Sequence, residues 1–168
     1  MKNKLLLLIL TAVAFAGAAL WVTFSLQSEE TKVKQVLEKL ILLGERPENP
    51  GAAELAVKLG SIDDIFADQV VIEFGRRSRI SGTYTQRSIE PLLVQYRKVF
   101  SRAHLDMDDL TVTISPEDTA NAVFSCRLSG KLQGQDYIEE VRDIDCRLKK
   151  TDGVWRIEKL DINEVLER

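Results

Sequence analysis

Histidine and cysteine are scarce in this chain, which has one histidine and two cysteines among 168 residues. So few nitrogen and sulfur ligands cannot complete a zinc centre without carboxylates. Glycine and proline are also few, at nine and four, while apolar residues make up 45% of the sequence, which excludes a collagen-like or disordered chain. The net charge of −3 supplies no general attraction to nucleic acid. We therefore expect a packed domain with no metal, no other cofactor and no nucleic-acid partner.

Charged residues are missing from one long segment near the N-terminus, the 22 residues Leu5–Leu26. A helix of that length spans about 33 Å, enough to cross the roughly 30 Å hydrocarbon core of a bilayer. We interpret residues 1–26 as an uncleaved transmembrane anchor that binds the lipid bilayer through Leu5–Leu26, followed by a short stalk at 27–31. Lys2 and Lys4 would stay in the cytoplasm by the positive-inside rule. In a bacterium this topology gives a single-pass inner-membrane protein whose C-terminal domain lies in the periplasm.

A cleaved signal peptide is the alternative interpretation of this segment. It would use the short apolar region Leu5–Val13 and the small-residue site Ala14-Phe15-Ala16, and the protein would be secreted. Cleavage there would leave the apolar residues 19–24 exposed on a soluble protein. The length of the uncharged run therefore favours the anchor.

Apolar spacing after the stalk predicts helices first and strands later. A period near 3.6 predicts helices at 33–43, 52–60 and 88–103, with His104 at the end of the third, and Ser61 can cap a further short helix. Alternating apolar residues predict strands at 67–74, 110–114, 120–128, 137–148 and 155–162. The last two strands each change phase once, which we interpret as β-bulges near Arg142 and Glu158. The pattern indicates an α+β domain with helices on one face of a curved sheet.

Three segments carry a resemblance to a known family. They are Phe-Ala-Asp-Gln-Val-Val-Ile-Glu-Phe at 66–74, Ser81-Gly82 ahead of the third helix, and Asp-Gly-Val-Trp-Arg-Ile at 152–157. Together with the element order, they resemble the nuclear transport factor 2-like (NTF2-like) superfamily, which includes SnoaL-like proteins, ketosteroid isomerase and limonene epoxide hydrolase. The resemblance implies a cone-shaped α+β fold over 32–168, with three helices on a strongly curved antiparallel sheet around a pocket open at one end. Such domains often dimerise, and the fold alone does not fix a function.

The catalytic residues of two enzyme branches of that family are not matched here. The resemblance places the isomerase base at Phe74 and one oxyanion donor at Ile144, and it requires a tyrosine on the first helix, which has none. Enolisation needs both a base and such donors. The hydrolase needs an Asp, Arg, Asp group, and Arg142, Asp143 and Asp145 offer the residue types. Consecutive strand residues alternate between faces, so we interpret these three as an ion-paired outer strand face and predict no catalytic residue.

Aromatic and basic side chains remain as candidates for binding. The candidate pocket-lining residues are all aromatic: Phe74, Tyr84, Tyr96, Phe124, Tyr137 and Trp155. Arg76, Arg77 and Arg79 are candidates for contact with an anion at the pocket mouth or with lipid headgroups. The alternative is that this basic run forms a solvated face beside the acidic strands.

The predicted strands bear on two questions, whether the cysteines form a disulfide and whether the protein dimerises. A hairpin at Gln133-Gly134 offsets Cys126 and Cys146 by about five residues, or about 16 Å, which is too far for a disulfide. We therefore predict two reduced, buried thiols. The outer sheet face is polar, with residues such as Thr111 and Asp143, so we expect a monomer or a weak homodimer.

Function follows from the anchor and from the missing catalytic set. We expect a membrane-tethered, extracytoplasmic NTF2-like domain that acts as a non-catalytic binding or assembly module, with an envelope protein as the candidate partner. The alternative is a small-molecule pocket enzyme of isomerase or hydrolase type, and a third option is a subunit of an envelope machine. We expect the cone to be filled mainly by its own apolar side chains, because burying each contributes about 1.5–3 kcal/mol.

Overall fold

A computed structural model describes residues 29–75, 81–134 and 137–164 of the chain. Four helices are described: 29–44, α2 (Ala52–Gly60), α3 (Ile62–Ile65) and α4 (Gln86–Val99). The strands are β1 (Phe66–Phe74), β2 (Gly82–Thr85), β3 (Phe100–Ser115), β4 (Thr119–Leu132), β5 (Tyr137–Thr151) and β6 (Val154–Glu164). They form one six-stranded sheet in the order β2-β1-β6-β5-β4-β3.

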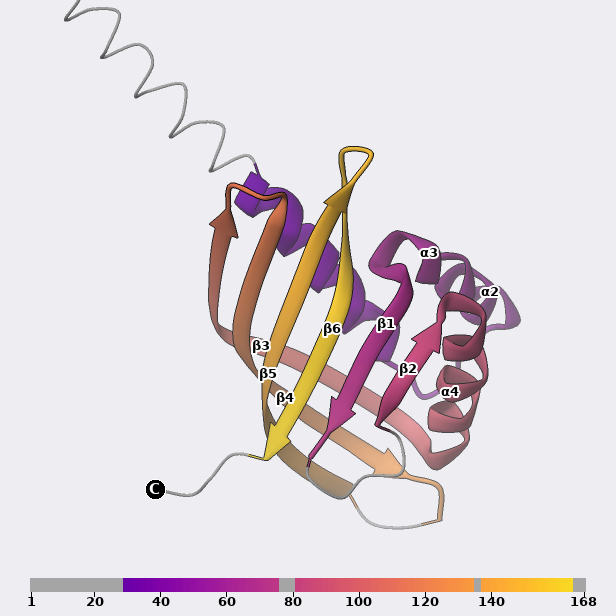
Figure 1. Ribbon diagram of the computed structural model, residues 1–168. Helices are drawn as coiled ribbons and strands as arrows, with labels where there is room; N and C mark the ends of the chain where they lie inside the picture. The colour runs from indigo at the N-terminus through magenta and orange to yellow at the C-terminus, as the bar shows by residue number, and fades with distance from the viewer. Residues whose placement is uncertain (1–28, 76–80, 135–136, 165–168) are drawn as a thin grey trace, which may run out of the picture.

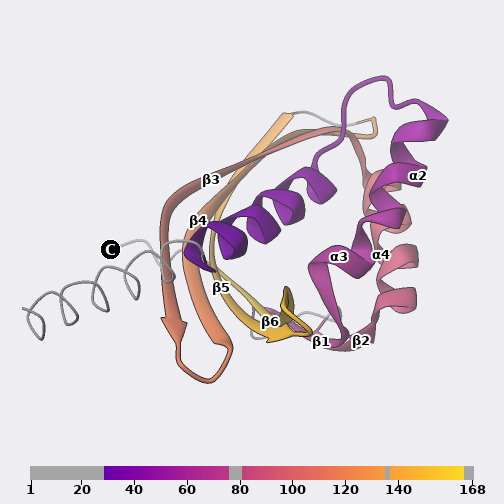
Figure 2. The same ribbon diagram turned by 90° about the horizontal axis from the view of Figure 1, so that it is seen from above.

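The sheet is strongly curved and wraps around the first described helix. Seen from above, β3 to β6 curl around helix 29–44, while α2, α3 and α4 gather beside β1 and β2 (Figure 2). The same clustering is visible in Figure 1, where the long strands lie side by side in front of helix 29–44. Val33 and Leu37 on that helix are fully buried, and they belong to one core cluster with Leu148 and Ile157 of the sheet. The expected layer of helices on a curved sheet is therefore confirmed.

The sheet is mainly antiparallel, with one parallel pairing. Strands β3 to β6 form an antiparallel meander, and β2 pairs with β1 in the same way. Strand β1 runs parallel to β6, pairing Ile72 with Leu160 and Phe74 with Ile162. The sequence did not predict β2, because its four residues include a glycine and two threonines and show no apolar alternation.

The boundary between the third helix and the next strand differs from the prediction. Helix α4 begins at Gln86, and Ser88 lies inside its first turn, where its Oγ accepts a hydrogen bond from the Thr85 N–H at 2.7 Å. The helix ends at Val99, and Phe100 opens β3, so His104 lies in a strand instead of ending the helix. The register of β3 against β4 shifts between Phe100 and Arg102, which turns both Phe100 and Ala103 inward. This bulge produces a spacing of three that imitates a helix.

One of the two predicted bulges is present and the other is not. Between β5 and β6, Arg147 pairs with Lys159 and Leu148 pairs with Ile157, so Glu158 is the extra residue and that bulge is confirmed. The predicted bulge near Arg142 is wrong, because the β4–β5 register runs unbroken from Thr119↔Lys149 to Lys131↔Tyr137. The even-numbered residues of β5 therefore face the helices along its length.

The N-terminal anchor prediction concerns residues 1–26, which lie outside the described part of the chain. Among the residues that are described, no helix is long and apolar enough to cross a bilayer. Glu29 is the first described residue of the helix at 29–44, and its carboxylate contacts residues of β5 and β6. The Trp155 Nε1–H donates to Glu29 Oε2 at 2.7 Å, and Lys150 Nζ lies 2.9 Å from the same oxygen. The first described turn of this helix is thus held against the β5–β6 hairpin.

Candidate functional site

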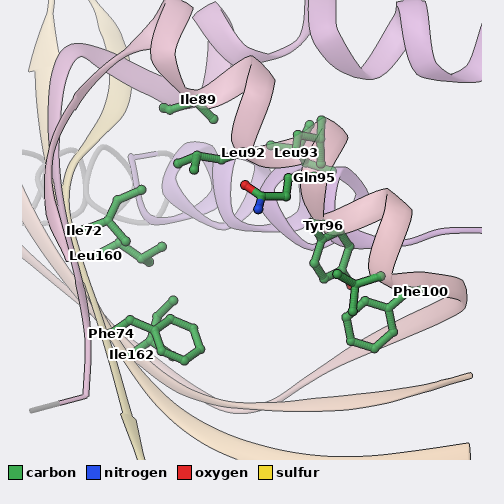
Figure 3. Close-up of a pocket in the computed structure, with 12 residues that line it drawn as sticks. Ile72, Phe74, Ile89, Leu92, Leu93, Gln95, Tyr96, Phe100, Leu160 and Ile162 are labelled. Atoms are coloured by element: carbon green, nitrogen blue, oxygen red, sulfur yellow. The ribbon is translucent and has the colours of Figure 1, made fainter. Parts of the chain in front are cut away.

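A cavity of about 490 Å³ separates α4 from the inner face of the sheet. Ile72 and Phe74 of β1 and Leu160 and Ile162 of β6 form one wall, and α4 forms the other (Figure 3). The exposed residue Gln95 of α4 also lines it. The lining is otherwise apolar or aromatic. The prediction of a cone filled mainly by its own side chains is confirmed for the buried core around helix 29–44 but not for the region beside α4. Beside α4 the chain's own side chains leave this space open.

A second lobe of about 430 Å³ adjoins the first and extends toward β4 and β5. The two lobes share the lining residues Leu43, Phe74, Leu93, Tyr96, Phe100 and Ile162. The second lobe adds Cys126 and Leu128 from β4 and Glu140, Arg142 and Ile144 from β5. The first lobe is almost wholly apolar, whereas the second holds charged groups.

Glu140 and Arg142 are the charged residues that line the second lobe. They stand two apart on β5, so both face inward, and Arg142 Nη2 forms an ion pair with Glu140 Oε1. The Arg142 guanidinium carbon lies 5.8 Å from the centre of the Phe74 ring, within the range of a cation–π contact. The Arg142 side chain is 21% exposed and that of Glu140 is 43% exposed. The guanidinium is therefore the more deeply placed charge of the pair.

Tyr96 and Cys126 add two protic groups to the cavity wall. The Tyr96 ring packs against Phe100 with centroids 4.8 Å apart, and its buried hydroxyl has no hydrogen-bond partner among the described residues. Burial raises the pKa of Tyr96 to about 12. Burial, followed by the nearby carboxylates of Asp106 and Asp108, raises the pKa of the Cys126 thiol to about 11. Both groups keep their protons at neutral pH.

The predicted pocket-lining residues lie in different places. Phe74 and Tyr96 line both lobes of the cavity. Phe124 is buried in the core, and Tyr84 of β2 packs partly buried against that core. Tyr137 is 63% exposed, and Trp155 is buried at the start of β6. The candidate anion-contact residues Arg76, Arg77 and Arg79 fall outside the described residues.

The interpretation of Arg142 as an outer-face residue is wrong, and that of its neighbours is supported. Asp143 and Asp145 face outward, where the Ser125 hydroxyl donates to Asp143 at 3.0 Å. Arg142 faces inward because the β5 register continues without the expected slip. The pattern that could have found it is the run of apolar residues at 144, 146 and 148, which, extended backward without a slip, points residues 142 and 140 inward.

The described residues supply neither the isomerase base and donor at the positions that the resemblance indicates nor a group of metal ligands. Phe74 and Ile144, where the family resemblance would place a base and a donor, line the cavity as apolar side chains. His104 lies outside the cavity lining, with Nδ1 2.8 Å from Glu45 Oε1 and Nε2 3.2 Å from Asp106 Oδ1. Among the residues described, no three His, Cys, Asp or Glu side chains are grouped to hold a metal ion. Cys126 and Cys146 are both free thiols, with Cys146 buried and Cys126 half-buried.

Similar folds occur among proteins of solved structure. A hexachlorocyclohexane dehydrochlorinase (LinA) type 2 is 14% identical with a TM-score of 0.68, and the match covers 83% of this chain and 87% of that one. A candidate scytalone dehydratase from Novosphingobium aromaticivorans is 9% identical with a TM-score of 0.69, over 87% and 99% of the two chains. An NTF2-like protein with a cystatin-like fold from the same organism is 12% identical with a TM-score of 0.68, over 89% and 90%. No family model and no curated protein matches the sequence.

These likenesses define the class of the domain by its fold. An NTF2-like protein is among the similar structures, and the match extends over most of both chains. At such low sequence identity the likeness concerns the fold and leaves the activity open. The described domain therefore has an NTF2-like fold, as the sequence resemblance implied.

Proposed function

We propose that this domain binds a small, largely apolar molecule in the cavity between α4 and the sheet. The observation that carries the proposal is the cavity itself, with its apolar first lobe of about 490 Å³. That volume lies within the roughly 300–1,000 Å³ typical of small-molecule sites. A few polar groups among apolar walls, here Glu140, Arg142 and Tyr96, are also typical of such sites. The self-filled binding module expected from the sequence gives way to a ligand pocket.

Protection of Cys126 from alkylation tests this proposal. Cys126 lines the second lobe, whereas Cys146 is fully buried and serves as an internal control. The full-length chain in phospholipid nanodiscs would be labelled with N-ethylmaleimide in the presence and absence of 2-naphthamide, a neutral aromatic probe. Mass spectrometry would follow each cysteine. We expect labelling of Cys126 to be faster than that of Cys146 and to slow several-fold with the probe.

A matched pair of variants shows whether the cavity is the binding site. Ile162→Trp places a bulky indole ring where the smaller Ile162 side chain lines both lobes, while Asn163→Trp adds the same ring at an exposed neighbouring position. We expect protection to disappear in the first variant and to persist in the second. Labelling of Cys126 that saturating probe leaves unchanged would refute the pocket proposal.

Proton transfer is a second candidate function, favoured by the position of Glu140. Its carboxylate faces the cavity and can accept a proton, and Arg142 can stabilise negative charge that develops nearby. Two similar folds carry the names of a dehydrochlorinase and a candidate dehydratase, and loss of HCl or of water includes the loss of a proton, which supports this candidate. This candidate corresponds to a small-molecule pocket enzyme.

A generic substrate tests this second candidate. In 5-nitrobenzisoxazole, a base removes the ring C–H proton while the N–O bond breaks to give a phenolate. We expect the protein to accelerate this step and Glu140→Gln to lower the rate roughly tenfold or more. Glu139→Gln is the control, because Glu139 is exposed on the same strand. Equal rates for the two variants would exclude Glu140 as a base.

We also propose that the domain is tethered to a membrane and faces the periplasm. The support is the uncharged run Leu5–Leu26 with Lys2 and Lys4 before it, and only two residues separate this run from Glu29. The intact mass of membrane-extracted protein should include Met1. A chain beginning near Gly17 or Ala19 would show that the segment is cleaved.

A further inference from the structure

Arg142 is an unusual residue for the wall of an apolar cavity. Its guanidinium stacks on Phe74, which lines both lobes, so the positive charge lies at the border of the ligand space. Removing a guanidinium from water is costly unless an anion compensates it. Glu140 supplies that anion from the same face of β5. The cavity therefore contains a cationic group whose charge is already balanced by the chain.

The two members of this pair differ in how firmly they are held. The Glu140 side chain is 43% exposed, so its carboxylate can turn into water at little cost in solvation. The Arg97–Glu54 pair offers a comparison within the same molecule. There the side chains are 8% and 25% exposed, with two hydrogen bonds of 3.1 and 2.6 Å. Glu140 thus has the exposure of a replaceable partner, and Arg142 that of a fixed one.

We propose that the ligand carries a carboxylate and that Arg142 binds it, with Glu140 occupying the same guanidinium while the cavity is empty. This inference rests on the proposed function of the cavity as a ligand site. A guanidinium presents N–H groups in a planar fork that matches the two oxygens of a carboxylate. The apolar body of the ligand would then lie in the first lobe, between α4 and the ends of β1 and β6. The ligand class is an aromatic or aliphatic carboxylic acid of small size.

The position of the guanidinium decides between an acid and an amine as ligand. An amine would pair with Glu140, whose carboxylate reaches farther into solvent than the Arg142 guanidinium. A cationic head there would draw the apolar body away from the cavity walls. A carboxylate on Arg142 leaves that body against Phe74 and the first lobe.

Matched probes separate this inference from the proposed function. 2-Naphthoate and 2-naphthamide have the same ring system and differ in charge, and 2-naphthylmethylamine supplies the cation. Their affinities for the full-length chain would be measured from the protection of Cys126 against N-ethylmaleimide. We expect 2-naphthoate to bind roughly tenfold more tightly than 2-naphthamide, because the charge-assisted bonds to Arg142 add to the same ring contacts.

Variants of the ion pair should act in opposite directions. Arg142→Gln should remove the preference for 2-naphthoate, and Arg142→Lys should keep only part of it, because lysine lacks the planar fork. Glu140→Gln should raise the affinity for 2-naphthoate about fivefold, since it removes a carboxylate that competes for the Arg142 guanidinium. Asp143→Asn is the control on the outer face of the same strand and should change neither affinity.

Each other outcome has a definite meaning. Equal affinities for acid and amide, tighter binding of the amine, or weaker binding of 2-naphthoate by Glu140→Gln would overturn the inference and leave the pocket proposal standing. Failure of all three probes to protect Cys126 would overturn both. If Arg142→Gln does not fold, the Glu140→Gln result still decides the matter.

Discussion

Arg97 of α4 and Glu54 of α2 form an ion pair. We expect removal of Glu54 to destabilise the domain more than removal of Arg97. Arg97 is 8% exposed and donates hydrogen bonds of 3.1 and 2.6 Å to the two carboxylate oxygens of Glu54. Glu54 is 25% exposed and has a second cation, Lys58, at 3.1 Å. Removing Glu54 leaves a buried guanidinium without this partner, whereas removing Arg97 leaves a carboxylate that still has Lys58 and water.

The expected magnitudes follow from that asymmetry. Loss of one member of a buried pair costs about 3–5 kcal/mol, and the partial exposure of Glu54 puts this pair at the lower end. We expect Glu54→Leu to lower the free energy of unfolding by about 3 kcal/mol and Arg97→Met by about 2 kcal/mol. The double variant should lose less than the sum, with a coupling energy of about 2 kcal/mol, because it leaves no unpaired charge.

Urea denaturation followed by far-ultraviolet circular dichroism measures these free energies on the full-length chain. Glu90→Gln is the control, because Glu90 is an exposed residue of α4, and it should change stability by less than about 0.5 kcal/mol. Additive single variants, or a larger loss for Arg97→Met than for Glu54→Leu, would refute the reasoning. The pH dependence gives a second check. The Arg97 guanidinium holds the pKa of Glu54 below its usual value, so the contribution of the pair is present at neutral pH and is lost as the solution is acidified below about 4.5.

Three further predictions concern other parts of the domain. Gly130→Ala should cost about 1–3 kcal/mol in thermal denaturation, because the added Cβ would lie 2.8 Å from a backbone carbonyl oxygen of β3, and an unchanged melting temperature would show that β4 can shift there. Hydrogen bonds from Lys32 and, to a lesser extent, Lys150 lower the pKa of Glu29 to about 2. The stability difference between the parent chain and Glu29→Gln should therefore be full above pH 4.5, at about 1–2 kcal/mol after solvent screening, and vanish as pH falls toward 2, a trend that a pH-independent difference would contradict. Phe74→Asp should lower stability by about 2–3 kcal/mol, the burial of one ring, since the new carboxylate would find Arg142 nearby, and a much larger loss would show that the charge stays unpaired.

Helix 29–44 shows which part of the fold the sequence could predict. Its apolar residues recur with a helical period, and three of them, Val33, Val36 and Leu37, are buried as expected. Such a pattern is reliable because a helix with one apolar face has a single way to bury it. The prediction that the helix continues from Val99 to His104 was wrong. The bulge in this strand places inward-facing residues three apart, and a helix does the same. The spacing of apolar residues therefore cannot distinguish a bulged strand from a helix. Pairing with β4 is what makes this segment a strand.

Part of the predicted pocket lining was wrong for a different reason. The sequence predicts an aromatic pocket lining, yet Phe124 is buried in the core and Tyr137 is exposed. The sequence predicts an ion-paired outer face for Arg142, Asp143 and Asp145, yet Arg142 faces the cavity, and the neighbouring Glu140 faces it too. Arg97 is a buried charged residue of α4, although charged side chains of a surface helix usually face water. Residue type alone therefore does not predict whether a side chain faces the core, the cavity or solvent. The strand register and the packing of the helices decide this.

The cavity and its charged wall have a common origin in the length of β5. The residues Ile144, Cys146 and Leu148 are buried in the core, and an unbroken register with β4 carries the same phase back to Tyr137. A slip that turned Arg142 outward would leave a ladder position unpaired or would expose the apolar residues that follow. The sheet therefore extends beyond the end of its own core and brings charged residues onto its inner face. Charged side chains can stand there only where water or a ligand also reaches, so the strand that closes the core at one end holds the cavity open at the other.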